Sequence, residues 1–184
     1  MLFIPWRYIA DWKCVACGLC CKTYSVVLSF PEWLSIVKNF GVDKTVSGLD
    51  KFFMRRGNDG SCVFLRQFSN NMCLCGIQQM KPKACKLWPF KISTKPKFGH
   101  GNEAVYSYAG NKLYIYADST CRGLRYGRPS WEFTDYTLKE LVEIALGLRN
   151  NQSITTASIS FPQSCVSSRI FNARNLLVSH YGSI

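Results

Sequence analysis

The residues with the clearest capacity for chemistry are the cysteines, which number 10 in a chain of 184 residues. Four of them occupy one short segment, Cys14-Val-Ala-Cys17-Gly-Leu-Cys20-Cys21. Gaps of two residues let a tight loop turn successive sulfurs toward one centre, and thiolates bind both zinc and iron-sulfur clusters. Gly18 suits such a loop because glycine accepts a positive φ. The spacing therefore predicts a metal site.

The first three cysteines reproduce the C-x2-C-x2-C spacing that gives three ligands to a cubane cluster in bacterial ferredoxins, with the fourth ligand supplied from elsewhere. The proline that follows the remote ferredoxin cysteine is missing, so the analogy is one of spacing. Cys20 and Cys21 are neighbours, and adjacent side chains generally diverge. This pair predicts a second centre or two irons of one cluster, and the alternative is one ligand beside a buried free thiol.

Disulfides are the rival explanation for so many cysteines. The first residues, MLFIPWRYIADWK, lack the charged region and apolar run of a signal peptide. No apolar stretch approaches the length of a membrane helix. We therefore expect a cytoplasmic protein with no membrane association, in which reduced thiols act as ligands.

The elements that must position these cysteines are short. We expect a strand at 23–30, a helix at 31–40 ended by Gly41, a second short helix at 45–56, and a hairpin turning at Gly110-Asn111. A capping box starting at Thr137 predicts a further helix, with an apolar face at Leu138, Leu141, Val142, Ala145 and Leu148.

These elements predict an α+β fold, namely a small single domain with cysteine-rich loops around one or two metal centres. Its length allows one ordinary domain. Composition changes near Asn150, so we expect a metal-binding domain over 1–150 and a polar, peripheral C-terminal tail over 151–184.

Later cysteines stand singly in short motifs: Ser61-Cys62-Val63-Phe64-Leu65, Cys75-Gly76-Ile77, Lys81-Pro82-Lys83-Ala84-Cys85 with Pro89-Phe90, and Cys121-Arg122-Gly123 with Gly127-Arg128-Pro129. With the first group, this ordered series resembles the YkgJ-type cysteine-cluster family, whose members are described as zinc- or iron-chelating domains. The resemblance implies metal ligands at Cys14, Cys17, Cys20, Cys21, Cys62, Cys75, Cys85 and Cys121.

Cys73 and Cys165 lie outside the family pattern and are expected to be small buried hydrophobes, although Cys73 is near enough to Cys75 to substitute as a ligand. Pro82 is expected to open a short helix carrying Cys85. Trp88 and Phe90 would either shield that sulfur from water or simply pack in the core.

Both metals accept four thiolates. Single, widely spaced cysteines completing a tight group favour an iron-sulfur cluster, most simply [4Fe-4S], over the paired knuckles of structural zinc sites, and only two histidines are present. The predicted function is cluster binding with a redox or cluster-dependent role. The alternatives are a zinc module, structural or nucleic-acid-binding, and a cluster-using S-adenosylmethionine-dependent protein lysine methyltransferase, because some proteins resembling the family are flagellin lysine N-methylases. Whether the chain is an enzyme stays open.

The formal net charge of +12 makes acidic partners the natural ones. Lys81, Lys83, Lys86, Lys91, Lys95 and Lys97 surround the Cys85 segment. We expect this charge to dock an acidic protein or a charged cofactor. A nucleic-acid partner is disfavoured, because the basic residues are scattered and form no recognition helix.

Overall fold

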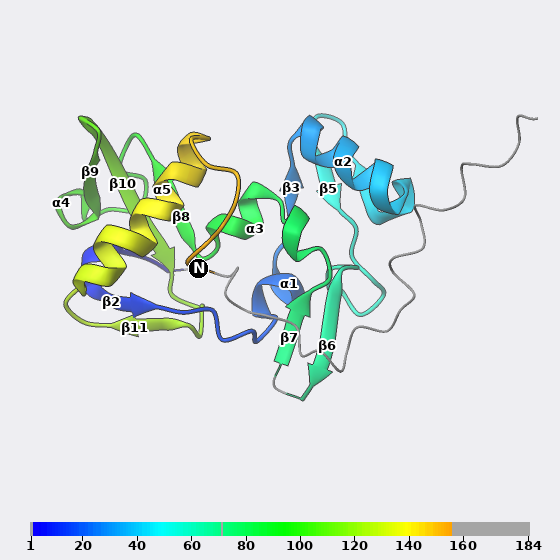
Figure 1. Ribbon diagram of the computed structural model, residues 1–184, viewed down its shortest axis with the longest axis horizontal. Coiled ribbons are helices and arrows are strands. Elements are labelled where there is room, and N and C mark those ends of the chain that lie inside the picture. Colours follow the sequence, from blue (N-terminus) through cyan, green and yellow to red (C-terminus); the bar gives the residue numbers. More distant parts are fainter. Residues whose placement is uncertain (1, 71, 156–184) are drawn as a thin grey trace, which may run out of the picture.

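The computed structural model describes residues 2–70 and 72–155, and it confirms the predicted α+β domain (Figure 1). Figure 1 shows two lobes, which we call the sheet lobe (3–12 and 89–155) and the hairpin lobe (19–80). Most of the predicted C-terminal tail lies outside the described residues. No helix in the described ranges is long and apolar enough to cross a membrane.

The sheet lobe is built on one long strand, β10 (Asn111–Asp118). This strand pairs antiparallel with β1 (Phe3–Pro5), β8 (Phe90–Ser93) and β9 (Val105–Tyr108). The predicted hairpin is thus confirmed, with its turn one residue earlier: Ala109 and Gly110 both have positive φ, and Asn111 already belongs to β10. The 3-10 turn η1 (Trp6–Tyr8) leads to β2 (Ile9–Trp12), which pairs with β11 (Leu124–Tyr126), and the short helix α4 (Gly101–Ala104) precedes β9.

The helix predicted from Thr137 begins earlier, so the predicted capping box is wrong. Ser130 Oγ accepts the backbone N–H of Phe133, and the chain continues through the π-helical turn η4 (Phe133–Leu138) into α5 (Lys139–Leu146). Thr137 is buried inside this continuous helix and therefore caps nothing. The predicted apolar face holds for Leu138, Leu141 and Val142, all fully buried, whereas Leu148 is exposed beyond the end of the helix.

Glu140 is a buried carboxylate that holds the first residues of the predicted tail against α5. It accepts hydrogen bonds from the backbone N–H groups of Ser153, Ile154 and Thr155, and it pairs with Arg149 at 3.1 Å. Burial alone would raise the pKa of Glu140, but the hydrogen bonds from Ser153 and Thr155 outweigh it and lower that pKa.

The hairpin lobe contains α2 (Phe30–Phe40), which confirms the predicted helix ending at Gly41. Its capping box is formed by Ser29 and Glu32. The strand expected at 23–30 shrinks to β3 (Val27–Leu28), because its two ends are taken by α1 (Leu19–Thr23) and by the start of α2.

The prediction of a short helix at 45–56 is wrong. Its place is taken by the antiparallel pair β4 (Thr45–Ser47) and β5 (Phe52–Met54), preceded by the turn η2 (Val42–Lys44). The β-branched and aromatic residues at these positions favour strands, and the N–H of Gly48 closes the turn on the carbonyl of Lys51 at 2.8 Å. A second hairpin, β6 (Leu65–Ser69) with β7 (Met72–Cys75), completes the lobe and leads into η3 (Gln78–Met80).

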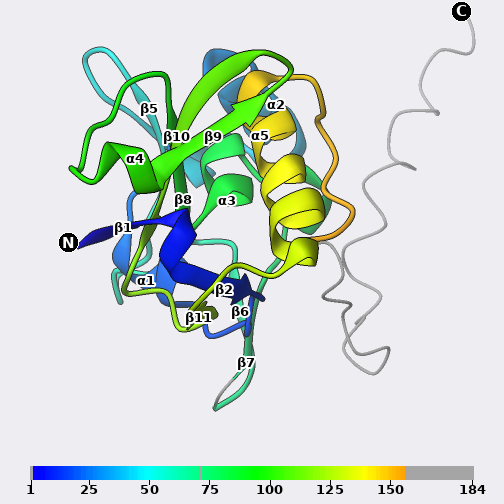
Figure 2. The same cartoon turned by 90° about the vertical axis from the view of Figure 1, so that its left-hand side faces the viewer.

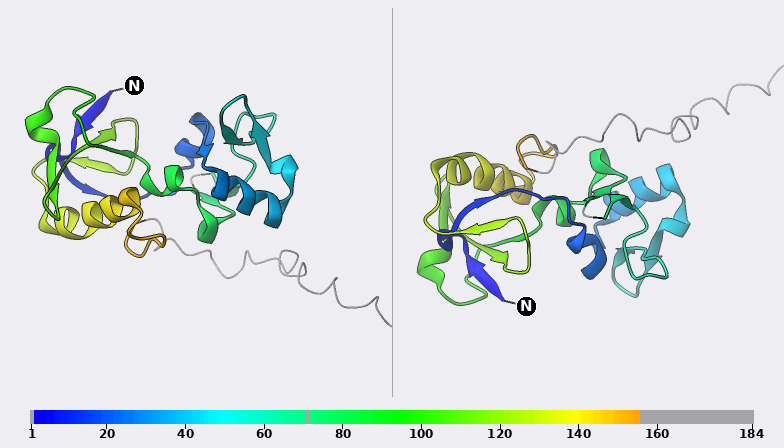
Figure 3. Two further views of the ribbon diagram at one scale, coloured as in Figure 1. Left: turned by 90° about the horizontal axis from the view of Figure 1, so that it is seen from above. Right: turned by 90° about the horizontal axis from the view of Figure 1, so that it is seen from below.

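Each lobe has its own hydrophobic core. In the sheet lobe, α5 packs on β8 (Figure 2), and the buried residues of the shared core include Ile9, Ile115 of β10 and Phe133. In the hairpin lobe the core is formed by Leu28, Ile36, Met54, Phe64 and Ile77. The connection 13–18 and the helix α3 (Lys83–Leu87) lie between the lobes when the molecule is seen from above and below (Figure 3). The cysteine-bearing segments therefore converge at the junction of two cores.

Candidate metal centre

The loop carrying the first cysteines is fixed at both ends by backbone contacts. At its start, the N–H of Lys13 donates to the carbonyl of Gly123 at 3.1 Å. Further on, Gly18 has φ +70, as predicted, and a Cβ there would lie 2.7 Å from the Cβ of Cys73. Only glycine fits this point, because any side chain would clash with β7 as well as strain the backbone. The loop then enters α1, which carries Cys20 and Cys21.

The remaining cysteines come from four other segments. The N–H of Cys62 donates to the carbonyl of Cys21 at 2.8 Å, which ties the loop before β6 to α1. Cys73 and Cys75 lie on β7, and Cys85 lies on α3, whose N-cap is Pro82 as predicted. Cys121 follows β10 in a turn closed by its N–H on the carbonyl of Asp118 at 3.1 Å.

These segments enclose one cavity of about 200 Å³, which we call the thiol pocket. Seven of the eight predicted ligands line it: Cys14, Cys17, Cys20, Cys21, Cys75, Cys85 and Cys121. Cys62 does not line the pocket. Cys73 does, and it is also buried and packed on Gly18, in agreement with its predicted structural role. All nine cysteines of the described ranges have free thiols, and Cys165 lies outside those ranges.

The thiols surround the pocket without converging on one point. Among residues 2–70 and 72–155, no three His, Cys, Asp or Glu side chains are close enough to hold one metal ion. The sulfurs of Cys20 and Cys21 are only 3.9 Å apart, however. The expectation that these neighbouring side chains diverge is therefore wrong, because the helical backbone of α1 directs both sulfurs into the same pocket.

Electrostatic interactions divide the thiols into two groups that share Cys20. On the sheet-lobe side, Cys14 interacts with Cys20 and Cys121, and Cys121 with Cys17. On the hairpin-lobe side, the interacting thiols are those of Cys20, Cys21, Cys62, Cys75 and Cys85. The core contacts follow the same division: Cys14 and Cys121 pack against the sheet-lobe core, and Cys62 and Cys75 against the hairpin-lobe core.

Burial keeps most of these thiols protonated in the absence of metal. It raises the pKa of Cys14, Cys62, Cys75 and Cys121, and most strongly that of Cys85. Cys20 is the exception: a hydrogen bond from the Cys21 thiol lowers the pKa of Cys20 to about 7, and the same bond raises the pKa of Cys21. The pair therefore shares one proton near neutral pH, and Cys20 is the first thiolate available to a metal.

Of the six lysines around the Cys85 segment, Lys81 and Lys91 line the thiol pocket. The positive charge of Lys81 opposes the effect of burial on the pKa of Cys14, Cys75 and Cys85. It also contributes to the lowered pKa of Cys20. The others point elsewhere. Lys83 and Lys86 donate from Nζ to the carbonyls of Ala145 and Asn150, and neither Lys95 nor Lys97 lines the pocket.

The aromatic side chains at the pocket differ from those expected. Trp88 lines the pocket and packs on Tyr24, with ring centroids 4.3 Å apart, whereas Phe90 is buried in the sheet-lobe core away from the lining. Sequence reasoning missed Trp12 and Tyr24, both of which line the pocket. The position of Trp12, two residues before Cys14, was the available signal, and Tyr24 offered none.

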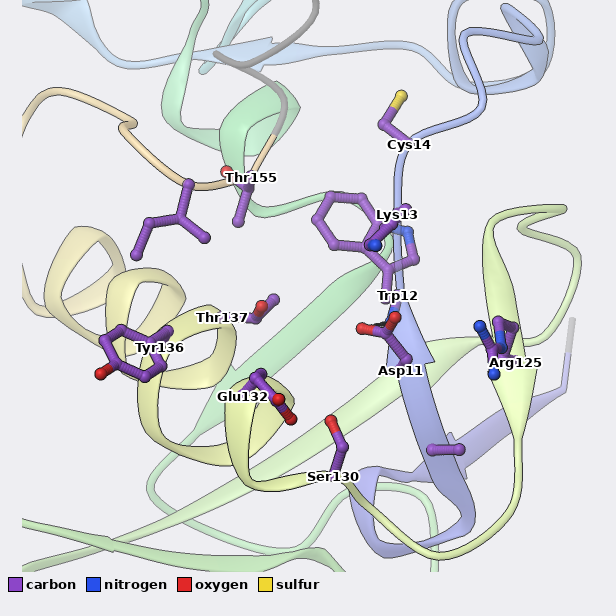
Figure 4. Close-up of a pocket in the computed structure, with 12 residues that line it drawn as sticks. Asp11, Trp12, Lys13, Cys14, Arg125, Ser130, Glu132, Tyr136, Thr137 and Thr155 are labelled. Atoms are coloured by element: carbon purple, nitrogen blue, oxygen red, sulfur yellow. Dashed lines mark hydrogen bonds between the residues drawn. The ribbon is translucent and has the colours of Figure 1, made fainter.

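A second, larger cavity of about 730 Å³ lies beside the thiol pocket and shares two lining residues with it, Trp12 and Cys14. Figure 4 shows Cys14 at one side of this cavity and the indole of Trp12 next to it. Polar side chains, among them Asp11, Ser130 and Glu132, make up another part of its lining.

Comparison with known proteins agrees with this chemistry. A family model named CxxCxxCC, described as a putative zinc- or iron-chelating domain, matches residues 13–122. The match spans more than half of the chain and includes all eight predicted ligands, from Cys14 to Cys121. The protein belongs to this family of zinc- or iron-chelating domains. Neither the curated proteins nor the solved structures compared with the chain include a match.

Proposed function

We propose that this zinc- or iron-chelating domain binds a [4Fe-4S] cluster in the thiol pocket and uses it in a redox or cluster-dependent reaction. The observation that carries the proposal is the crowding of eight thiols around one cavity, with Cys20 shared by two interacting groups. One zinc ion takes four ligands, so this donor set exceeds the need of a single ion, and soft thiolates suit iron-sulfur clusters.

The sheet-lobe group offers the simplest set of ligands. Cys14, Cys17 and Cys20 have the spacing of three cubane ligands, and Cys121 interacts with this set from a remote segment, as a fourth ligand should. A cluster bound there would supply one-electron redox chemistry. The chain would hold it between two cores, with Trp12 and Trp88 limiting water and Lys81 favouring the anionic form of the ligands.

Zinc is the second candidate, and one distance favours it. Two thiolates bound to a tetrahedral zinc ion at about 2.3 Å must lie about 3.8 Å apart. The sulfurs of Cys20 and Cys21 are 3.9 Å apart. The hairpin-lobe group would then hold zinc through Cys20 and Cys21 together with two of the thiols of Cys62, Cys75 and Cys85.

Anaerobic purification followed by absorption spectroscopy and analysis of iron, zinc and sulfide tests the proposal. We expect a brown protein with broad absorption at about 400 nm and equal amounts of iron and acid-labile sulfide. Two triple variants locate the centre: Cys14→Ser/Cys17→Ser/Cys121→Ser should lose iron, and Cys62→Ser/Cys75→Ser/Cys85→Ser should retain it. A colourless, folded protein with stoichiometric zinc would establish the second candidate instead.

A further inference from the structure

Trp12 has a buried polar group that the fold leaves without a conventional partner. The residue is 3% exposed, and its indole Nε1 is the one buried side-chain nitrogen or oxygen in the described ranges that has no hydrogen-bond partner. Such groups are rare in folded proteins, because burial removes the water that would otherwise satisfy them. The other tryptophan of this core, Trp6, donates normally to the carbonyl of Val105 at 3.0 Å.

The orientation of the Trp12 ring is determined by the elements around it. Trp12 pairs with Leu124 across β2 and β11, and its ring meets Phe90 edge-on, with centroids 5.5 Å apart. On its Nε1 side lies Gly123: a Cβ there would stand 3.3 Å from Nε1 and 2.1 Å from the carbonyl oxygen of Lys13. The absence of a side chain at Gly123 therefore leaves the indole N–H facing the turn that begins at Cys121.

The sulfur of Cys121 is the acceptor that this turn offers. Trp12, Cys121 and Gly123 line the same thiol pocket. Burial raises the pKa of the Cys121 thiol, and the nearby Trp12 side chain acts to lower it, so the two side chains face each other although no hydrogen bond of ordinary geometry joins them. A neutral thiol is a weak hydrogen-bond acceptor, whereas a metal-bound thiolate is a strong one.

We infer that Trp12 is a positioning residue of the metal centre, whose indole N–H donates a hydrogen bond to the metal-bound thiolate of Cys121. The inference rests on the proposed function in taking Cys121 as a ligand. Its physical basis is that metal binding converts the thiol into a thiolate and thereby satisfies the buried N–H. Hydrogen bonds to ligand atoms fix their orientation and typically change metal affinity by about 10–100-fold.

Trp12→Phe tests this, because phenylalanine keeps an aromatic ring but has no N–H. The probe is Cd²⁺ alone, added to the metal-free protein and measured by competition with a chelator. We expect about 10–100-fold weaker binding by Trp12→Phe. The matched control is Trp6→Phe, which removes the indole N–H of another buried tryptophan of the same core and should leave the affinity unchanged. Equal affinities for Trp12→Phe and the wild type, or equal losses in the two variants, would overturn the inference.

Two further measurements separate this result from misfolding and from failure of the proposed function. Replacing Trp12 by 3-benzothienylalanine retains the bicyclic shape without the N–H, and it should weaken Cd²⁺ binding as Trp12→Phe does. In metal-free protein, the indole N–H resonance of Trp12 should shift on Cys121→Ala and stay in place on Cys62→Ala. An unshifted resonance refutes the contact even if metal binds, and a shifted one supports it even if the wild type binds no metal.

Discussion

The hydroxyl of Tyr24 donates a 3.0 Å hydrogen bond to Oδ2 of Asp118, which joins the segment after Cys20 and Cys21 to the end of β10. Asp118 is fully buried, and its other oxygen accepts hydrogen bonds from the N–H and hydroxyl of Thr120. The backbone carbonyl of Asp118 also closes the turn at Cys121. One carboxylate thus links two cysteine segments that are about a hundred residues apart in the sequence.

We therefore predict that Tyr24→Phe weakens metal binding although it removes no ligand. The variant leaves one acceptor of Asp118 without its donor, so unfolding should become easier by about 1 kcal/mol. Metal affinity should fall with it, because the two cysteine segments lose a shared anchor. Urea denaturation and Cd²⁺ competition measure the two effects. Tyr126→Phe is the control, since this exposed tyrosine donates its hydroxyl to a turn carbonyl, that of Ser119, and a similar loss in both variants would argue against the link.

A second prediction concerns Gly18, where the strain of a positive φ and a steric clash coincide. Gly60 provides a matched control: its φ is +74, close to that of Gly18, but a Cβ there would meet nothing within 4 Å. Gly60→Ala should cost about 1 kcal/mol of stability from backbone strain alone. Gly18→Ala should cost at least about 2 kcal/mol more and should reduce metal loading, because Cys73 must move. Equal thermal shifts for the two variants would show that the contact with Cys73 has no effect.

The parts of the fold that sequence predicts well are those determined by local chemistry. Gly41 ends α2, Pro82 opens α3, and alternating residues around Gly110 form the β9–β10 hairpin. Sequence-based prediction fails where contacts between residues distant in the sequence determine the local structure. Thr137 and Glu140 match a capping box in the sequence. In the structure, the carboxylate of Glu140 instead accepts hydrogen bonds from residues 153–155, and Ser130 caps the helix.

The site could be predicted only in part for the same reason. Two-residue spacing places Cys14, Cys17 and Cys20 in one loop, but spacing cannot show that β7, α3 and the turn after β10 meet that loop. It also cannot show that α1 brings the sulfurs of Cys20 and Cys21 to 3.9 Å. The position of Trp12 two residues before Cys14 is a weak signal in the sequence, and only the structure shows that its ring lines the pocket and that its N–H has no acceptor.

A third prediction concerns the ligands themselves. Cys17→Ser or Cys20→Ser should lose the metal and much of the folding stability, because metal binding is coupled to folding. Cys165→Ser should change neither. Metal analysis and thermal denaturation of the three purified variants decide the matter. Loss of metal from Cys165→Ser combined with its retention in Cys17→Ser would overturn the proposed ligand set.

A fourth prediction concerns the basic surface, which we propose serves docking to an acidic protein or a charged cofactor. Binding to random DNA should then be weak, should collapse as salt is raised, and should show little preference among sequences. Fluorescence anisotropy with duplexes that differ by single base pairs measures this. Nanomolar affinity at physiological salt with a large penalty for one base change would instead favour the nucleic-acid alternative.

The last prediction is that the metal-free protein loses stability as pH rises above about 8.5, the pKa of an unfolded cysteine. Burial raises the pKa of Cys75 and Cys85, so in that range the folded state binds more protons than the unfolded state, and unfolding becomes more favourable with rising pH. Cys20 acts in the opposite direction between pH 7 and 8.5, because its pKa is lowered to about 7, so its ionisation increases the stability of the folded state in that range.

Urea denaturation under reducing conditions at pH 7.5, 8.5 and 9.5 measures this dependence. Well above its unfolded pKa, one such buried thiol lowers the free energy of unfolding by about 1.4 kcal/mol for each pH unit. Cys85→Ala should flatten the decline, since it removes a thiol whose pKa is strongly raised by burial. Metal loading should remove from the decline only the contribution of those thiols that become ligands, because these are already thiolates. Constant or increasing stability of the metal-free wild type from pH 8.5 to 9.5 would show that the thiols are not held protonated by burial.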